Sequence, residues 1–169
     1  MKRVAIFLAI MLVSVSALFA AGEISTAQRG TIKTSAAEIR ALLADVNHWA
    51  DWCPAVGQAE LIQGDGQTVG SRIKFHPVIA GKKLPTAVKL TLSKSEPPGL
   101  LEYTGSQPGL KITRGWKLEE KEGVCEITSY ETITGPGVKA FIRLYGKDGL
   151  DQEHRTWVEA IKKKIESKK

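Results

Sequence analysis

Two residues of opposite charge, Arg114 and Glu131, occupy positions where the surrounding pattern predicts burial. Segments 111–118 and 124–133 alternate apolar and polar residues with period two, as the arms of a half-buried antiparallel hairpin do. Glu122-Gly123 is typical of a two-residue loop, which would pair residues whose numbers sum to 245 and so set Arg114 opposite Glu131. A loop of another length moves the partner by two residues and keeps Glu131 on the same face. The sequence therefore predicts an inward-pointing Arg and Glu among Trp and Ile side chains.

Two roles are open to Arg114 and Glu131. A lone buried charge is costly, so the two side chains are expected to neutralise each other when the protein is empty. Arg114 could also grip a ligand carboxylate or phosphate through two parallel hydrogen bonds, which the planar guanidinium favours. Pairing within the protein does not exclude contact with a ligand, and both roles stay open.

His154 is a third candidate for chemistry, because it falls on the apolar stripe of the last helical segment. It is either a satisfied, half-buried histidine or a polar group that faces a pocket. In an enzyme, Glu131 would be the acid or base and His154 a second proton carrier. An arginine partner keeps a carboxylate ionised, which suits a base better than an acid. No nucleophile–base motif, phosphate loop or metal-ligand spacing accompanies them, so neither a cofactor nor a metal is predicted.

The elements that would position these residues follow from periodicity. Apolar residues at helical spacing over 150–165 predict a long amphipathic C-terminal helix, preceded by a shorter one at 138–145. Ser35 and Glu38 form a capping-box pattern that predicts a helix after the first strand, and a second short helix is expected at 47–52. Besides the hairpin, strands are predicted at 24–33, 56–63, 70–77, 84–94 and 100–104.

Length, composition and charge limit the kinds of protein that this chain can be. The chain has 169 residues, of which 43% are hydrophobic and 25% charged, as expected for one globular domain with a sizeable core. Much of the formal charge of +6 comes from Lys162–Lys164 and Lys168–Lys169. Lysines suit the C-terminal end of a helix, and no basic stripe or interleaved aromatic residues accompany them. A nucleic-acid partner is therefore not expected.

Residues 1–21 are typical of an export signal. Lys2-Arg3 precedes an apolar run from Val4 to Val13, and small residues follow at Ala20-Ala21-Gly22. The alternative is an uncleaved anchor, because the apolar stretch is barely long enough to span a membrane. We expect a periplasmic or secreted domain over residues 22–169, or a membrane-anchored one if the leader is kept. The mature domain itself is not expected to insert into a membrane, and it is expected to be a monomer or weak dimer.

The two cysteines, Cys53 and Cys125, leave two alternatives open. An even count in an oxidising compartment permits one disulfide. Both residues could equally be buried free thiols, since Cys packs as a small hydrophobe.

Several residue strings, in their order and spacing, resemble the polyketide cyclase/dehydrase and lipid-transport family of the START-like (SRPBCC) superfamily, which includes the birch-pollen-allergen fold. The resemblance spans roughly Ser25 to Glu166. Its opening landmarks are Ile32–Ile39, Leu42–Val46 and Trp49–Pro54, and its later ones are Val69–Ile73, Gly115–Leu118, Glu131–Gly135 and Trp157–Lys162.

This resemblance implies an α+β helix-grip fold, in which a curved antiparallel sheet of about seven strands wraps a long C-terminal helix around an apolar cavity. Two short helices would follow the first strand. Members of the superfamily bind lipids, sterols and plant hormones, and a few catalyse cyclisation or dehydration. We therefore expect a module that binds a small hydrophobic or amphiphilic molecule, lipid-like or polyketide-like. The alternative is a cyclase, dehydratase or hydrolase that uses Glu131 in the same cavity.

The candidate ligand-binding residues follow from this fold and from the predicted inward faces. The apolar wall would come from Phe75, Leu90, Tyr103, Ile112, Trp116 and Ile127. The polar contacts would come from Arg114 and Glu131, together with Tyr145 or His154.

Overall fold

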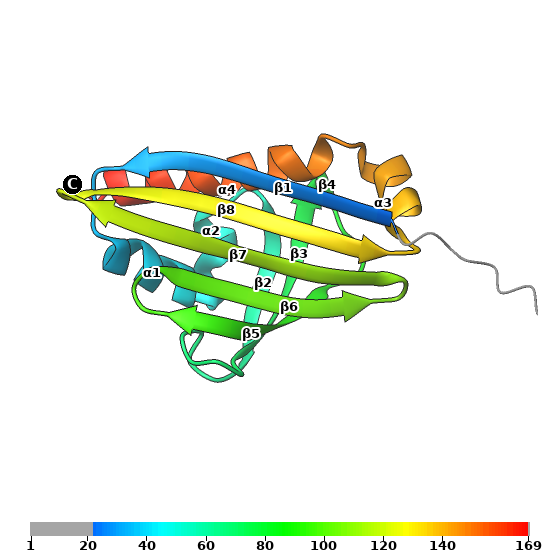
Figure 1. Cartoon of the computed structure of the whole chain (residues 1–169), viewed down its shortest axis with the longest axis horizontal. Helices are drawn as coiled ribbons and strands as arrows, with labels where there is room; N and C mark the ends of the chain where they lie inside the picture. Colours follow the sequence, from blue (N-terminus) through cyan, green and yellow to red (C-terminus); the bar gives the residue numbers. More distant parts are fainter. Residues whose placement is uncertain (1–21, 169) are drawn as a thin grey trace, which may run out of the picture.

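A long antiparallel sheet curls around one helix in the computed structural model, which describes residues 22–168 (Figure 1). Within those residues the main sheet has seven strands in the order β1-β8-β7-β6-β5-β3-β2, and a two-residue strand, β4, pairs with β3. The strands are β1 (Gly22–Ile32), β2 (Val56–Gln63), β3 (Arg72–Ile79), β4 (Lys82–Lys83), β5 (Val88–Glu96), β6 (Leu100–Gln107), β7 (Leu110–Lys121) and β8 (Val124–Gly135). The expected α+β helix-grip fold is confirmed, whereas the predicted leader at 1–21 lies outside the described residues.

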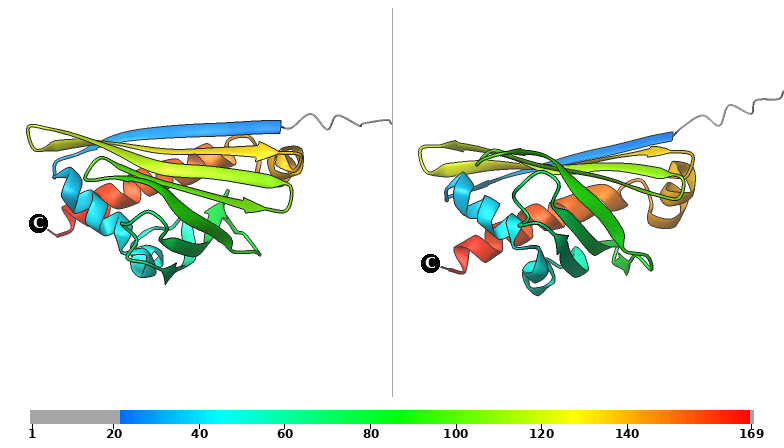
Figure 2. Two further views of the ribbon diagram at one scale, coloured as in Figure 1. Left: turned by 60° about the horizontal axis from the view of Figure 1, so that its bottom comes forward. Right: turned by 90° about the horizontal axis from the view of Figure 1, so that it is seen from below.

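The long helix α4 (Gly149–Glu166) lies across the concave face of the sheet (Figure 2). It packs against β1, β8 and β3. The short helix α3 (Val138–Tyr145) leads into α4 beside the start of β1 and the end of β8. At the other end, α1 (Ala36–Ala44), the 3-10 turn η1 (Val46–His48) and α2 (Trp49–Trp52) follow β1, and both helices contact α4 and the sheet (Figure 2).

The β7–β8 hairpin forms as the alternation predicts. Lys121 pairs with Val124, and the intervening Glu122 and Gly123 have φ of 54° and 76°, as a two-residue hairpin loop with two left-handed residues requires. This register sets Arg114 opposite Glu131. Both side chains are buried on the face that meets α4.

The helix after β1 also begins where its cap predicts. Ser35 is the N-cap, and its hydroxyl oxygen accepts a hydrogen bond of 3.2 Å from the backbone N–H of Glu38. The apolar stripe that follows, including Ile39 and Leu43, is fully buried.

One predicted strand was wrong at its start. We expected a strand over 84–94, but β5 begins only at Val88. The Leu84 N–H bonds the carbonyl oxygen of Pro77, and Pro85 has no N–H to contribute to a ladder. Residues 84–87 therefore form a connection, and this connection borders the cavity described below.

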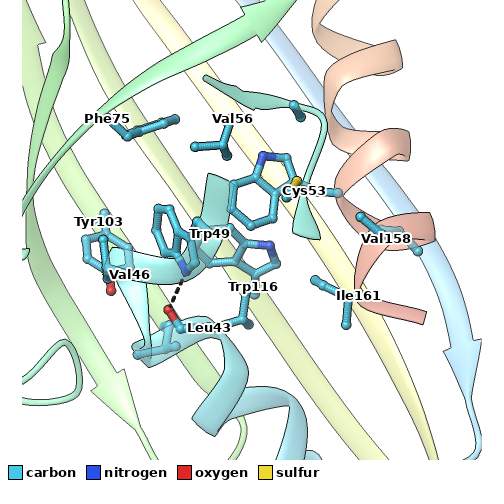
Figure 3. Close-up of a cluster of buried hydrophobic side chains, with 14 of the residues drawn as sticks. Leu43, Val46, Trp49, Cys53, Val56, Phe75, Tyr103, Trp116, Val158 and Ile161 are labelled. Carbon is cyan, nitrogen blue, oxygen red and sulfur yellow. Dashed lines mark hydrogen bonds between the residues drawn. The ribbon is translucent and has the colours of Figure 1, made fainter. Parts of the chain in front are cut away.

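The core near α1 and α2 is filled by large aromatic rings (Figure 3). The Trp157 ring makes edge-on contacts with Trp49 and Trp116, at centroid separations of 5.0 and 5.2 Å. Trp49 also donates from its indole N–H to the Leu43 carbonyl oxygen at 3.0 Å. These rings therefore tie α2, β7 and α4 together by edge-to-face packing.

The sheet and α4 are in close contact at a glycine. Gly30 of β1 lies against Val158 of α4, and a Cβ atom at Gly30 would come within 2.5 Å of Val158 Cγ1. Glycine is thus required there by the close approach of the helix.

Candidate functional site

A group of buried charged side chains lies near the start of α4, between its second turn and the β7–β8 hairpin. Arg114 is 2% exposed, and its Nη2 donates to Glu153 Oε1 at 2.7 Å. Its Nη1 lies 3.6 Å from Glu131 Oε2. His154 Nε2 lies 2.8 Å from the same Glu131 oxygen. We call Arg114, Glu131, Glu153 and His154 the ionic cluster.

The ionic cluster is assembled by one hairpin and one helix. The β7–β8 register supplies Arg114 and Glu131 from neighbouring strands, and α4 supplies Glu153 and His154. Trp157 lies one helical turn after Glu153, and its indole N–H donates to Glu153 Oε1 at 3.0 Å. Glu153 is thus held by a guanidinium and an indole on the same oxygen.

His154 links the cluster to a hydroxyl. Its Nδ1 lies 2.8 Å from Ser129 Oγ, and its Nε2 faces Glu131. An ionised Glu131 can only accept, so Nε2–H donates to it and Nδ1 accepts from Ser129 when the ring is neutral. The order Ser–His–Glu resembles a catalytic triad, but Ser129 is fully buried and does not line the cavity. Ser129 therefore orients the imidazole and is not accessible as a nucleophile.

Electrostatics keep Glu131 ionised. Burial raises the pKa of its carboxyl, but the Arg114 charge and the hydrogen bond from His154 outweigh burial and bring the pKa below its usual value. Burial lowers the pKa of Arg114, and the charges of Glu153 and Glu131 more than restore it. The guanidinium carbon also lies 5.1 Å from the centroid of the Phe75 ring, within cation–π range.

A cavity of about 260 Å³ opens beside the ionic cluster. Arg114, Glu131 and Glu153 form its polar inner wall. The remaining wall is mainly apolar and comes from strands β3, β5, β7 and β8, the connection before β5, the β6–β7 turn and α3. Its members include Phe75, Ile79, Leu84, Val88, Leu110, Ile133, Phe141 and Leu144. A concave apolar site with a few convergent polar groups is the usual form of a small-molecule site.

Residues 23–166 match the family of polyketide cyclase / dehydrase and lipid transport proteins. The chain belongs to this family. No curated protein matches the sequence. Several solved structures are similar to the chain in fold.

The Zhui aromatase/cyclase from Streptomyces sp. R1128 is similar with a TM-score of 0.69 at 14% identity, over 86% of this chain and 94% of that one. Norcoclaurine synthase from Thalictrum flavum, in complex with dopamine and hydroxybenzaldehyde, has a TM-score of 0.66 at 15% identity, over 100% and 99%. Ara h 8.0201 has a TM-score of 0.63 at 22% identity, over 86% and 99%. At these identities the likeness shows a shared fold.

Six of the ten residues named from the sequence line the cavity of this family member: Phe75, Leu90, Ile112, Arg114, Glu131 and Tyr145. His154 does not line the cavity itself, but its Nε2 lies within 3.5 Å of polar atoms of the lining residues Arg114, Glu131 and Glu153. Tyr103, Trp116 and Ile127 lie in the packed core and not among the cavity-lining residues, which corrects their predicted place. Trp116 and Ile127 share inward faces with the ionic cluster, but they lie further along their strands, where the aromatic rings fill the space.

Glu153 was not among the site residues predicted from the sequence. It is 2% exposed, contacts Arg114 directly and lines the cavity. A signal was present, because Glu153 falls three residues after Leu150 and four before Trp157 on the stripe of α4. The contribution of Phe141 and Leu144 of α3, and of residues 84–86, to the wall was not predicted either.

Three members of the cluster could serve as metal ligands. One donor atom from each of Glu131, Glu153 and His154 lies within 4.8 Å of the others. Arg114, however, supplies positive charge to both carboxylates from within the same group. It would have to move away before a divalent cation could bind, so the donor set suits an ion pair better than a metal.

Both cysteines are free and buried in the part of the chain that the structure describes. The disulfide alternative is therefore not formed: Cys53 follows α2, whereas Cys125 lies in β8 opposite Ile32. Burial raises the pKa of the Cys53 thiol to about 12. The described residues also contain no helix with the length and apolar character needed to cross a membrane.

Proposed function

We propose that this protein binds a small, predominantly apolar molecule in the cavity between the sheet, α3 and α4. The observation that carries the proposal is an apolar cavity whose inner wall is made by three buried charged side chains, Arg114, Glu131 and Glu153. Apolar wall supplies affinity through burial, and the few polar groups orient the ligand.

The size of the cavity narrows the class of ligand. Its volume of about 260 Å³ lies just below the usual range of small-molecule sites, which is about 300–1,000 Å³. It suits a single ring system or one short alkyl chain better than a two-chain lipid. Membership of a family that includes cyclases and lipid-transport proteins supports the same class of ligand.

Catalysis in the same cavity is a second candidate, supported by one observation. Glu131 lines the cavity, its pKa is held below the usual carboxyl value by Arg114 and His154, and so it is available as a base at neutral pH. The aromatase/cyclase and the norcoclaurine synthase with the same fold are enzymes by name. Binding remains the first proposal because an apolar pocket accounts for more of the site than one base does.

Native mass spectrometry of the purified protein, followed by denaturing extraction, tests the binding proposal. A small apolar molecule should be retained in the native spectrum and released on denaturation. Val88→Phe, which adds volume inside the cavity, should lower its occupancy at least tenfold, while Val124→Phe on the exposed hairpin end serves as the matched control. Equal occupancy in the two variants would place the ligand elsewhere and contradict the proposal.

Export is a further proposal, which rests on the leader-like residues 1–21. The intact mass of the protein recovered from its native compartment should correspond to a chain that begins near Gly22. A chain that retains residue 1 at a membrane would instead support the anchored alternative. Sedimentation of the same sample tests the expectation of a monomer or weak dimer.

A further inference from the structure

The mouth of the cavity is marked by the lining residues that are also exposed to solvent. They come from the connection before β5, the β6–β7 turn and α3, and none of them is charged. These residues are Pro85, Thr86, Pro108, Ala140 and Leu144. Leu144 is 62% exposed, more than any other large hydrophobic residue among residues 22–168. The rim of the cavity is therefore a mainly apolar surface that faces water, and such a patch commonly contacts a partner.

Basic side chains lie directly beside this rim on α3. Ala140 and Leu144 form one row along the helix, and Lys139 and Arg143 form the adjacent row. Lys147 follows shortly after the helix ends. The three basic residues are exposed and form no ion pair with any other residue that the structure describes. We call Lys139, Ala140, Arg143, Leu144 and Lys147 the α3 face.

The opposite end of the long strands has a different character (Figure 1). Val124 at the tip of the β7–β8 hairpin is also an exposed apolar residue, but the acids Glu122 and Glu126 flank it. A second basic group, Lys162 and Lys163, lies near the end of α4, and that helix has no exposed large hydrophobic residue. Among these three surfaces, the α3 face combines unpaired cations with an exposed apolar side chain.

The first described strand begins at the same end. A Cβ atom at Gly22 would lie 2.9 Å from Val138 Cβ, so β1 starts in contact with α3. The leader-like residues 1–21 are thus joined to the domain beside the α3 face. In the anchored alternative, this is the end of the domain that would be held next to the bilayer.

We propose that the α3 face docks on the surface of a membrane that contains anionic lipids. The cations are attracted by the negative surface potential of such a membrane. Leu144 would enter the boundary between head groups and acyl chains, as the apolar residues of an interfacial helix do. The domain would lie on the bilayer without crossing it. This inference goes beyond the proposed function, because it names a partner for the outer surface and does not depend on which ligand binds inside.

Docking in this orientation sets the mouth of the cavity against the lipid. Leu144 belongs both to the α3 face and to the cavity wall, and Pro85 and Pro108 continue the apolar rim. An apolar molecule that passes between the bilayer and the cavity would then stay in contact with apolar surface, which lowers the cost of its transfer.

Sedimentation with lipid vesicles tests the proposal, with the soluble protein recovered from its native compartment and no added ligand. The protein should bind an equimolar mixture of phosphatidylcholine and phosphatidylglycerol at least tenfold more tightly than phosphatidylcholine alone. Raising the salt from about 0.05 M to about 0.5 M should weaken this binding, because salt screens exposed charges. Equal binding to the two lipid compositions, or binding to neither, would overturn the proposal and leave the proposed ligand binding standing.

Two double variants with the same change in net charge test the orientation. Lys139→Gln combined with Arg143→Gln should weaken binding to the anionic vesicles at least tenfold. Lys162→Gln combined with Lys163→Gln, at the far end of α4, should weaken it less than threefold. Leu144→Ser should also weaken binding, through loss of its apolar contact. An equal loss from the two double variants would mean that net charge alone attracts the protein, and the α3 face would not be the docking surface.

Hydrogen exchange tests the same orientation independently of residues 1–21. Anionic vesicles should slow amide exchange in residues 138–147 and leave residues 121–126 at the hairpin tip unchanged. Slowing at the hairpin tip without slowing in α3 would contradict the proposal. A dimer that Leu144→Ser dissociates, together with no vesicle binding, would instead assign the α3 face to contact with a second copy of the chain.

Discussion

The space between the sheet and α4 has two unlike ends. Towards α1 and α2 it is filled by Trp49, Trp116 and Trp157 in mutual edge-on contact. Towards α3 it holds the cavity of about 260 Å³ with an apolar wall. We refer to these as the packed end and the open end, and the ionic cluster lies at the boundary between them.

The same strands and the same helix build both ends, so the difference is one of residue type along a shared register. On β7 the inward face passes from Ile112 and Arg114 at the cavity to Trp116 at the packed end. On α4 one helical turn separates Glu153, which lines the cavity, from Trp157, which is buried among rings. One core therefore has a packed end that is rigid and an open end that can bind a ligand, and the ionic cluster lies between the two ends.

Arg114→Ala should have the largest effect on stability, because it removes the cation of the ionic cluster that lies between the two ends. Glu131 and Glu153 would remain buried and face each other without their shared cation. We expect a loss of about 3–5 kcal/mol in the free energy of unfolding, measured by urea titration. Arg72→Ala, on the exposed face of β3, is the matched control. A loss equal to that of the control would mean that the charges are solvated.

Trp116→Ala and Phe141→Ala compare the two ends directly. Trp116 is surrounded by rings, so its truncation should cost about 3–5 kcal/mol. Phe141 borders the cavity and already lacks packing partners on one side, so its loss should cost about 1–3 kcal/mol. Saturating ligand should enlarge the penalty for Phe141→Ala and leave that of Trp116→Ala unchanged. Equal penalties without ligand would argue that the open end is as well packed as the other.

Acid should lower the free energy of unfolding, partly through protonation of Glu131 in the ionic cluster. The native pKa of Glu131 lies below its ordinary value of 4.5, so the unfolded chain takes up this proton first as the pH falls. The contribution of Glu131 to stability is therefore present above about pH 4.5 and lost progressively below it. Glu131→Gln should give a shallower fall in unfolding free energy between pH 6 and pH 3 than the unaltered protein. If the unfolding free energy of the two proteins fell equally with pH, Glu131 would not contribute to the acid sensitivity.

The smallest effect concerns the thiols of the packed core. Burial raises the pKa of Cys53 to about 12 and also raises that of Cys125, so neither forms a thiolate readily at pH 8. A thiol reagent such as dithionitrobenzoate should label neither residue over minutes in the native protein. It should label two per chain after unfolding without a reductant. No labelling after unfolding would mean that the two cysteines are bridged.

The hairpin was predictable from sequence because its information is local. Period-two alternation fixed the faces, and the Glu122-Gly123 loop fixed the register that sets Arg114 opposite Glu131. Order and spacing of short motifs extended this to the helix-grip fold. The long helix was equally clear, because its stripe repeats over 18 residues.

The composition of the cavity wall was less predictable, because it depends on contacts between distant segments. Trp116 and Ile112 have the same pattern along β7, and only the rings of other elements decide which of them lines a void. Residues 84–86 were assigned to a strand, although Pro85 takes them out of the ladder and into the wall. Glu153 was overlooked because an acid on a helix is usually solvated, and its partner lies 39 residues earlier in the chain.

Gly30 carries a consequence for how such a pocket could change. Because β1 touches Val158 through a residue without a side chain, this contact sets how closely α4 lies to the sheet. A methyl group added at position 30 would force Val158 or α4 to shift. The seating of the helix that carries Glu153 thus depends on a residue that does not itself line the cavity.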